Sequence, residues 1–176
     1  GEHVTHDPAA GSTPPSTDQA RGPGDLLADR YRLSDLLQET HGGRMWRAHD
    51  LVLSRDVAVH LIAATDPRAD DLLSAARRSA ILVDRRILRV LDAESRDDIC
   101  YVVSEWADGT SLDILLEDGP LDAQRAAWIT AEAASALATA HAVGYAHGRL
   151  TPESVLIDIS GTVRIIGFAV DAALAG

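Results

Sequence analysis

Few side chains in this sequence have both a type and a spacing suited to chemistry. His3 and His6 could share a metal ion, but no further ligand lies near them, so two solvated tail histidines are the simpler interpretation. The acidic run 92–98 could hold a cation, yet it is better explained as a solvated hairpin turn. All sixteen basic residues are arginine, which excludes any site whose chemistry requires lysine.

The charge and composition of the chain limit the classes of partner that it can bind. The net charge is −11 and the isoelectric point is near 4.9, so the surface repels phosphate backbones and anionic lipids. We therefore expect no nucleic-acid partner. The lone Cys100 lies in an apolar run and predicts buried packing rather than a disulfide. The alanine-rich stretch 123–143 contains charged residues, so it predicts a soluble helix and no direct membrane insertion by this chain.

The pattern of elements predicts an α+β fold. Residues 1–29 are poor in large aliphatic side chains and are expected to be a disordered linker. Strands are then followed by one helix, two more strands, helices and a hairpin, without a strand-helix alternation. The predicted strands are 31–38, 44–50, 55–62, 87–94, 99–106, 155–158 and 162–166; the predicted helices begin at Asp66 and span 111–117 and 122–143.

This order resembles the protein kinase fold, closest to the bacterial serine/threonine kinases. Five segments carry the resemblance: a glycine-rich-loop region, a strand that would bear the phosphate-binding lysine, a hinge, a catalytic loop and a metal-binding turn (37–50, 56–60, 104–109, 145–157 and 163–169). The resemblance implies an antiparallel N-lobe sheet with one helix and a hinge over residues 30–109. It implies a truncated, partly helical C-lobe over residues 110–176, without an activation segment.

The residues that hold the nucleotide in kinases are replaced. Gln38 and Thr40 stand at the first two glycine positions of the loop, and only Gly43 remains. His60 replaces the lysine that binds the α- and β-phosphates. Ala75 replaces the glutamate that would hold that lysine. Because side chains occupy phosphate space and the cation is lost, the resemblance predicts a degenerate nucleotide site with no cofactor.

The residues that perform the transfer are replaced as well. Arg149 stands where kinases have the catalytic aspartate, and an arginine cannot accept a proton near neutral pH. Thr151 replaces the loop lysine, and Ser154 replaces a metal-binding asparagine. Gly167 replaces the main Mg²⁺-binding aspartate. We therefore expect a pseudokinase, which is not an enzyme and has no metal site.

Positions that only pack in kinases are kept, including His147, Pro152 and Phe168. This division predicts a fold retained as a scaffold. The alternative is an atypical nucleotide-binding kinase with residual phosphotransfer activity. That alternative needs a replacement carboxylate, for which Asp158 and Asp171 are the nearest candidates.

The arginine-only composition and these substitutions resemble the intracellular pseudokinase domains of the actinobacterial MviN family. These are peptidoglycan-precursor flippase-like membrane proteins. The resemblance implies a cytoplasmic domain of a membrane protein, with a role in cell-wall synthesis and cell shape. It also implies phosphorylation by an upstream serine/threonine kinase and binding to a forkhead-associated (FHA) domain protein. Thr13 and Thr17 are the accessible candidate sites within this chain, and a further site is expected beyond Gly176.

Overall fold

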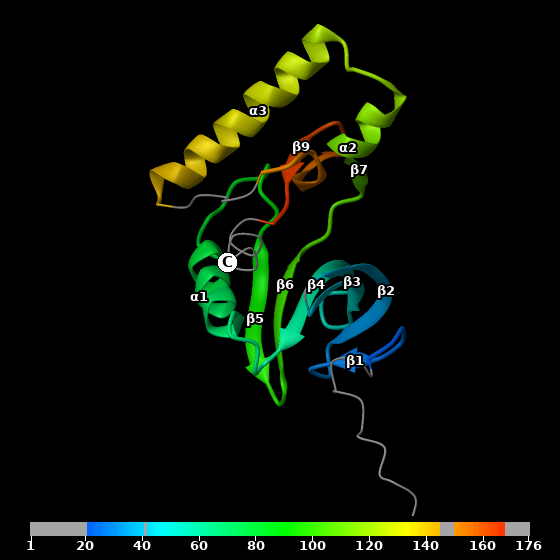
Figure 1. The fold of residues 1–176 in the computed structure, drawn as a ribbon, viewed down its shortest axis with the longest axis vertical. Helices are drawn as coiled ribbons and strands as arrows, with labels where there is room; N and C mark the ends of the chain where they lie inside the picture. Colours follow the sequence, from blue (N-terminus) through cyan, green and yellow to red (C-terminus); the bar gives the residue numbers. More distant parts are fainter. Residues whose placement is uncertain (1–20, 41, 145–149, 168–176) are drawn as a thin grey trace, which may run out of the picture.

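A curled antiparallel sheet dominates the computed structural model, which describes residues 21–40, 42–144 and 150–167 (Figure 1). Its strand order is β1-β2-β3-β4-β6-β5. The helix α1 (Ala69–Ser79) follows β4 and packs beside β5. The strands are β1 (Leu26–Leu27), β2 (Tyr31–Thr40), β3 (Gly43–Asp50), β4 (Arg55–Ala63), β5 (Val90–Arg96) and β6 (Ile99–Glu105).

A smaller unit follows the hinge after β6. Its three-stranded sheet has the order β7-β8-β9, and the long helix α3 lies across it at the top of Figure 1. The elements are β7 (Gly109–Ser111), α2 (Leu112–Leu115), η1 (Leu116–Asp118), α3 (Ala123–Ala142), η2 (Pro152–Ser154), β8 (Val155–Asp158) and β9 (Val163–Ile165). The predicted α+β class is confirmed. No helix in the described ranges combines the length and apolarity needed to cross a membrane.

Strand β4 separates two apolar cores, as its strict alternation predicts. Val57, Val59 and Leu61 face a core built with the buried Trp46 of β3. Ile62 faces the second core, which α1 covers. Five of the six side chains from Val57 to Ile62 are buried and His60 is partly exposed, so a polar side chain placed among them must find a partner or stay neutral.

The acidic run 92–98 does form a hairpin, but its first half is not simply solvated. Asp92 accepts a hydrogen bond of 2.9 Å from the hydroxyl of Tyr31, and Glu94 accepts one of 2.7 Å from that of Tyr101. The two tyrosine rings meet edge to face at 6.3 Å. These bonds give the buried tyrosines their polar partners. Only the turn, where Asp97 has a φ of 56°, matches the sequence interpretation.

The structure confirms the start of one predicted helix and corrects that of another. Asp122 caps α3 as predicted, its carboxylate accepting a bond from Arg125 N at 2.9 Å. Helix α1 starts at Ala69, not at Asp66. Asp66 instead accepts bonds from the backbone and the guanidinium of Arg68, in a turn before the helix. Asp66 and Pro67 therefore form a turn, and Asp66 does not cap α1.

The predicted disordered linker over residues 1–29 is wrong for its last part, because residues 21–29 are ordered. Leu26 and Leu27 pair with β2, and Leu27 is 2% exposed. Gly24 N donates to Leu33 O at 2.7 Å, and Leu33 N donates to Asp25 O at 2.9 Å. One buried leucine and this short ladder order a segment whose composition alone predicts disorder. Residues 1–20 lie outside the described residues.

Gly109, the last residue of the expected hinge, begins strand β7. A Cβ added there would lie 2.5 Å from the carbonyl oxygen of Ile157 in β8. Gly109→Ala is therefore expected to push β7 from β8 and to cost about 1–3 kcal/mol of unfolding free energy. Urea denaturation would measure this. Gly119→Ala is no control because Gly119 has a positive φ, whereas Gly22→Ala meets nothing within 4 Å and should be close to neutral.

Candidate functional site around His60

His60 lies on β4 between Met45 of β3 and Val102 of β6. Its Nδ1 atom is inaccessible to solvent and has no hydrogen-bond partner among the described residues. Burial lowers the pKa of His60 to about 4, because a charged imidazole would lose its hydration there. The ring is therefore neutral at pH 7.

Helix α1 brings no acid to His60. Ala75, the position expected for the partner glutamate, lies in the middle of this helix and is only partly buried. The acids of α1 are Asp70 and Asp71, which lie exposed in its first turn. The described part of the chain thus has no ion pair between β4 and α1.

The hairpin of β2 and β3 is paired up to its tip. Gln38 pairs with Met45, and Thr40 pairs with Gly43, in an antiparallel ladder whose register shifts between Leu36 and Gln38. Gln38 is exposed, and Gly43 is buried in the ladder. Gly42 has a φ of 82°, and a Cβ there would lie about 4 Å from the Asp66 and Arg68 side chains. The β2–β3 hairpin, which was expected to cover the phosphates, is thus hydrogen-bonded up to its turn, and Gly42 is the glycine that adopts a positive φ there.

Thr151, Ser154 and Gly167 are brought together at the start of β8. The hydroxyls of Thr151 and Ser154 are 3.2 Å apart, and Ser154 is 4% exposed. Ile166 N donates to Ser154 O at 2.9 Å, which places Gly167 beside this turn. None of these three residues carries an anionic group. Arg149, together with Thr13 and Thr17, lies outside the described residues, as do His147, Phe168 and Asp171.

Asp158 is not free to replace a lost metal ligand. It lies at the far end of β8, where its Oδ1 accepts bonds from Ser160 N, Ser160 Oγ and Thr162 N at 3.0, 2.6 and 2.9 Å. Its Oδ2 is 3.7 Å from Arg164. Hydrogen bonds, first of all from the Ser160 hydroxyl, lower the pKa of Asp158. The carboxylate therefore fixes the turn between β8 and β9.

A polar cluster at the hinge was missed in the sequence. Arg47 of β3 stacks on the Trp106 ring at 4.6 Å and forms an ion pair with Asp56 at 2.6 Å. Trp106 Nε1 donates to Asp108 at 3.0 Å, and Arg47 lies 3.9 Å from Asp108. The hydrogen bonds from His49 and Arg47 lower the pKa of Asp56. This cluster ties the β3–β4 hairpin to the segment joining the two sheets.

The comparisons with known proteins come from sequence and from structure. No family model matches the chain. The chain is 33% identical over 158 residues to "Serine/threonine-protein kinase PknB" of Mycobacterium leprae, covering 85% of the chain and 25% of that protein. It is 28% identical over 156 residues to "Serine/threonine-protein kinase PrkC" of Bacillus subtilis, covering 86% of the chain and 24% of that protein.

A comparison with solved structures identifies a similar fold. A solved structure described as "PpkA-294 apo form" superposes with a TM-score of 0.73 at 19% identity, covering 88% of this chain and 64% of that one. The chain spans about a quarter of the length of the curated relatives it matches. The chain is thus homologous to bacterial serine/threonine protein kinases, and its described residues adopt a protein kinase-like fold.

Proposed function

We propose that this chain is a pseudokinase, which neither binds Mg-ATP at physiological concentration nor transfers phosphate. The single observation that carries the proposal is the state of His60. At the position where kinases have a charged lysine, this chain has an imidazole whose pKa is lowered to about 4 and whose Nδ1 has no hydrogen-bond partner among the described residues. A neutral ring does not offset the charge of the α- and β-phosphates.

The rest of the cleft supports the same proposal. Phosphoryl transfer depends almost wholly on positioning and on neutralising charge. The Thr151–Ser154 turn beside Gly167 offers hydroxyls where a kinase would offer Mg²⁺ ligands. The nearby carboxylate of Asp158 is committed to its own turn. Each of the charges that would lower the barrier therefore needs a substitute that the described residues do not supply.

The biological role proposed is a phosphorylation-regulated scaffold. An upstream serine/threonine kinase would phosphorylate a threonine flanking the fold, and an FHA domain protein would then bind it. A phosphothreonine adds about −1.5 to −2 charges and three acceptor oxygens, which suits an arginine-lined FHA pocket. The resemblance to the MviN family supports a place at the cytoplasmic face of the membrane, where recruitment would control peptidoglycan synthesis.

The test uses the chain and its Thr13→Ala/Thr17→Ala variant, each treated with an active bacterial serine/threonine kinase. We expect the phosphorylated chain to bind an isolated FHA domain in the micromolar range and the untreated chain not to bind. Loss in the double variant would assign the mark to the tail. If the phosphorylated and untreated chains bind equally, or neither binds, phosphorylation of this chain does not regulate docking.

A further inference from the structure

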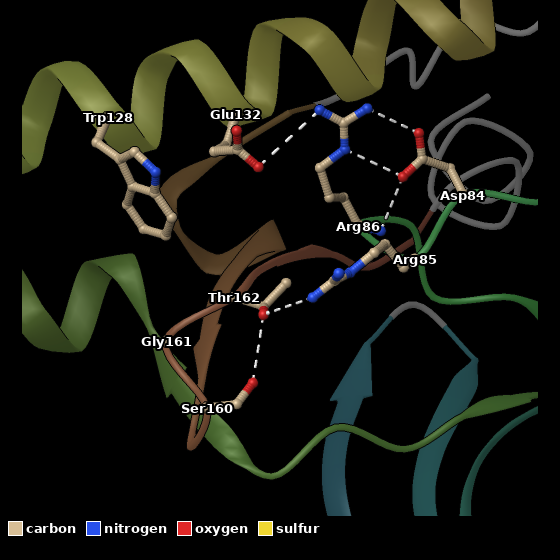
Figure 2. Close-up of a pocket in the computed structure, with 8 residues that line it drawn as sticks. All are labelled: Asp84, Arg85, Arg86, Trp128, Glu132, Ser160, Gly161 and Thr162. Carbon is tan, nitrogen blue, oxygen red and sulfur yellow. Dashed lines mark hydrogen bonds and ion pairs between the residues drawn. The ribbon is translucent and has the colours of Figure 1, made fainter.

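A pocket lies between α3, the β8–β9 turn and the loop that precedes Ile87 (Figure 2). Its volume is about 710 Å³, a size typical of ligand sites. Trp128 forms one end and is 44% exposed, and its ring borders the space in Figure 2. Arg85 crosses from the opposite side toward Thr162. The pocket therefore places an aromatic face and a cation on facing walls.

The walls of this pocket are fixed before any ligand arrives. Arg86 holds Asp84 through bonds of 3.1 and 2.9 Å and reaches Glu132 of α3 at 4.0 Å. The hydrogen bonds from Arg86 lower the pKa of Asp84. The β8–β9 turn is fixed by Asp158, as described above. A preformed site loses little entropy on binding, so weak contacts can suffice for affinity.

The hydrogen-bonding capacity left over in the pocket consists of donors on the Arg85 and Trp128 side and of the Glu132 carboxylate on the α3 wall, which reaches Arg86 only at 4.0 Å. Arg85 donates only to the Thr162 hydroxyl, at 3.3 Å, and has no carboxylate partner among the described residues. The indole N–H of Trp128 likewise has no hydrogen-bond partner in the described ranges. Both oxygens of Asp84 are already used by Arg86. An arginine next to free donors favours a carboxylate ligand, and an exposed indole favours an apolar side chain beside it.

We propose that this pocket docks an acidic, extended segment of a partner protein. A glutamate or aspartate carboxylate of that segment binds Arg85 at the hairpin wall, and a neighbouring aliphatic side chain packs on Trp128. Glu132 lies on the α3 wall and opposes the incoming charge, so the carboxylate stays on the hairpin side (Figure 2). This inference gives the proposed scaffold a specific docking surface, and it rests on that role.

The test is a pull-down of two pooled octapeptide libraries by the unphosphorylated chain, with mass-spectrometric readout. One pool fixes glutamate two positions from leucine, and the other fixes glutamine in its place. We expect enrichment of the glutamate pool. Arg85→Gln and Trp128→Ala should each weaken binding of a selected peptide about fivefold to tenfold. Glu132→Gln should strengthen it severalfold, because a repulsive charge is removed.

The matched control is Arg96→Gln at the tip of the β5–β6 hairpin, at the other end of the molecule in Figure 1. It changes the net charge as Arg85→Gln does but should leave binding unchanged. Equal enrichment of the two pools, equal losses in the Arg85 and Arg96 variants, or indifference to Trp128→Ala would each overturn the proposal. Because these peptides require neither phosphorylation nor an FHA domain, failure here leaves the phosphorylation test to decide separately on the proposed function.

Discussion

Replacing His60 with lysine is expected to lower the free energy of unfolding by about 3 kcal/mol and to restore neither Mg-ATP binding nor phosphate transfer. The site is dry enough to lower the imidazole pKa to about 4, so it would hold an ammonium group at a similar disadvantage. An unpartnered buried charge costs several kcal/mol. Chemical denaturation and an autophosphorylation assay would measure the two outcomes.

The control for this prediction is the pair His60→Lys/Ala75→Glu. If α1 faces His60 as kinase resemblance implies, the new glutamate should recover 1 kcal/mol or more of the lost stability, on the order of a coupled pair. Phosphate transfer should still be absent, since groups that act as a unit are strongly non-additive. Measurable turnover in His60→Lys alone would show that the rest of the cleft is competent.

The same imidazole gives the parent chain a defined pH dependence. The folded pKa of about 4 lies below the ordinary value of 6.5, so the unfolded chain binds the proton more tightly. Stability should therefore fall as the pH drops from about 6.5 to about 4, by up to about 3 kcal/mol. His60→Gln should remove this dependence. An unchanged pH profile in that variant would mean that His60 is hydrated.

Removing the carboxylate of Asp50 is expected to cost about 2–3 kcal/mol of unfolding free energy, a large share of a typical domain's stability. Its side chain is 2% exposed and forms an ion pair with Arg30 at 2.9 Å. It also accepts bonds from the backbone of Val52 and Leu53, which fixes the turn before β4. Asp50→Ala therefore removes the ion-pair partner of Arg30 and the acceptor that holds the turn at Val52 and Leu53. Urea denaturation at pH 7 would measure the loss.

Asp35→Ala is the matched control, because Asp35 is exposed on the neighbouring strand and should change stability by less than about 0.5 kcal/mol. Asp50 also has a pH signature. Its hydrogen bond with Arg30 lowers its pKa from 3.8 to about 2. The stabilisation is complete above about pH 4 and lost as the pH falls through 2, an amount of about 2 kcal/mol. A loss in Asp50→Ala no larger than in Asp35→Ala would contradict the account.

Most elements could be predicted because their signals are local. The predicted strand 55–62 and the predicted helix 122–143 each match the structure to within one residue at either end. β1 could not be predicted, since two leucines have no period and their order comes from pairing with β2. The start of α1 was wrong because Asp-Pro is equally good as a turn.

The candidate site was predicted through resemblance, not through spacing. Nothing local in the sequence says that His60 lies in a cleft; only the kinase register does so. The hinge cluster was missed because Arg47, Asp56 and Trp106 are distant in sequence and meet only when the hairpin folds against the hinge. The one available signal was Arg47 and His49 on the polar face of a strand whose other face holds Trp46 and Ala48.

A thermal-shift measurement with Mg-ATP on the unmodified chain tests whether this chain is a pseudokinase that does not bind nucleotide. A ligand present at 100 times its dissociation constant would stabilise the fold by about 2.7 kcal/mol, which corresponds to a melting shift of several degrees. No shift is expected with millimolar ATP, with or without Mg²⁺. A Mg²⁺-dependent shift of several degrees, lost in His60→Gln, would contradict this expectation and would favour a nucleotide-binding kinase.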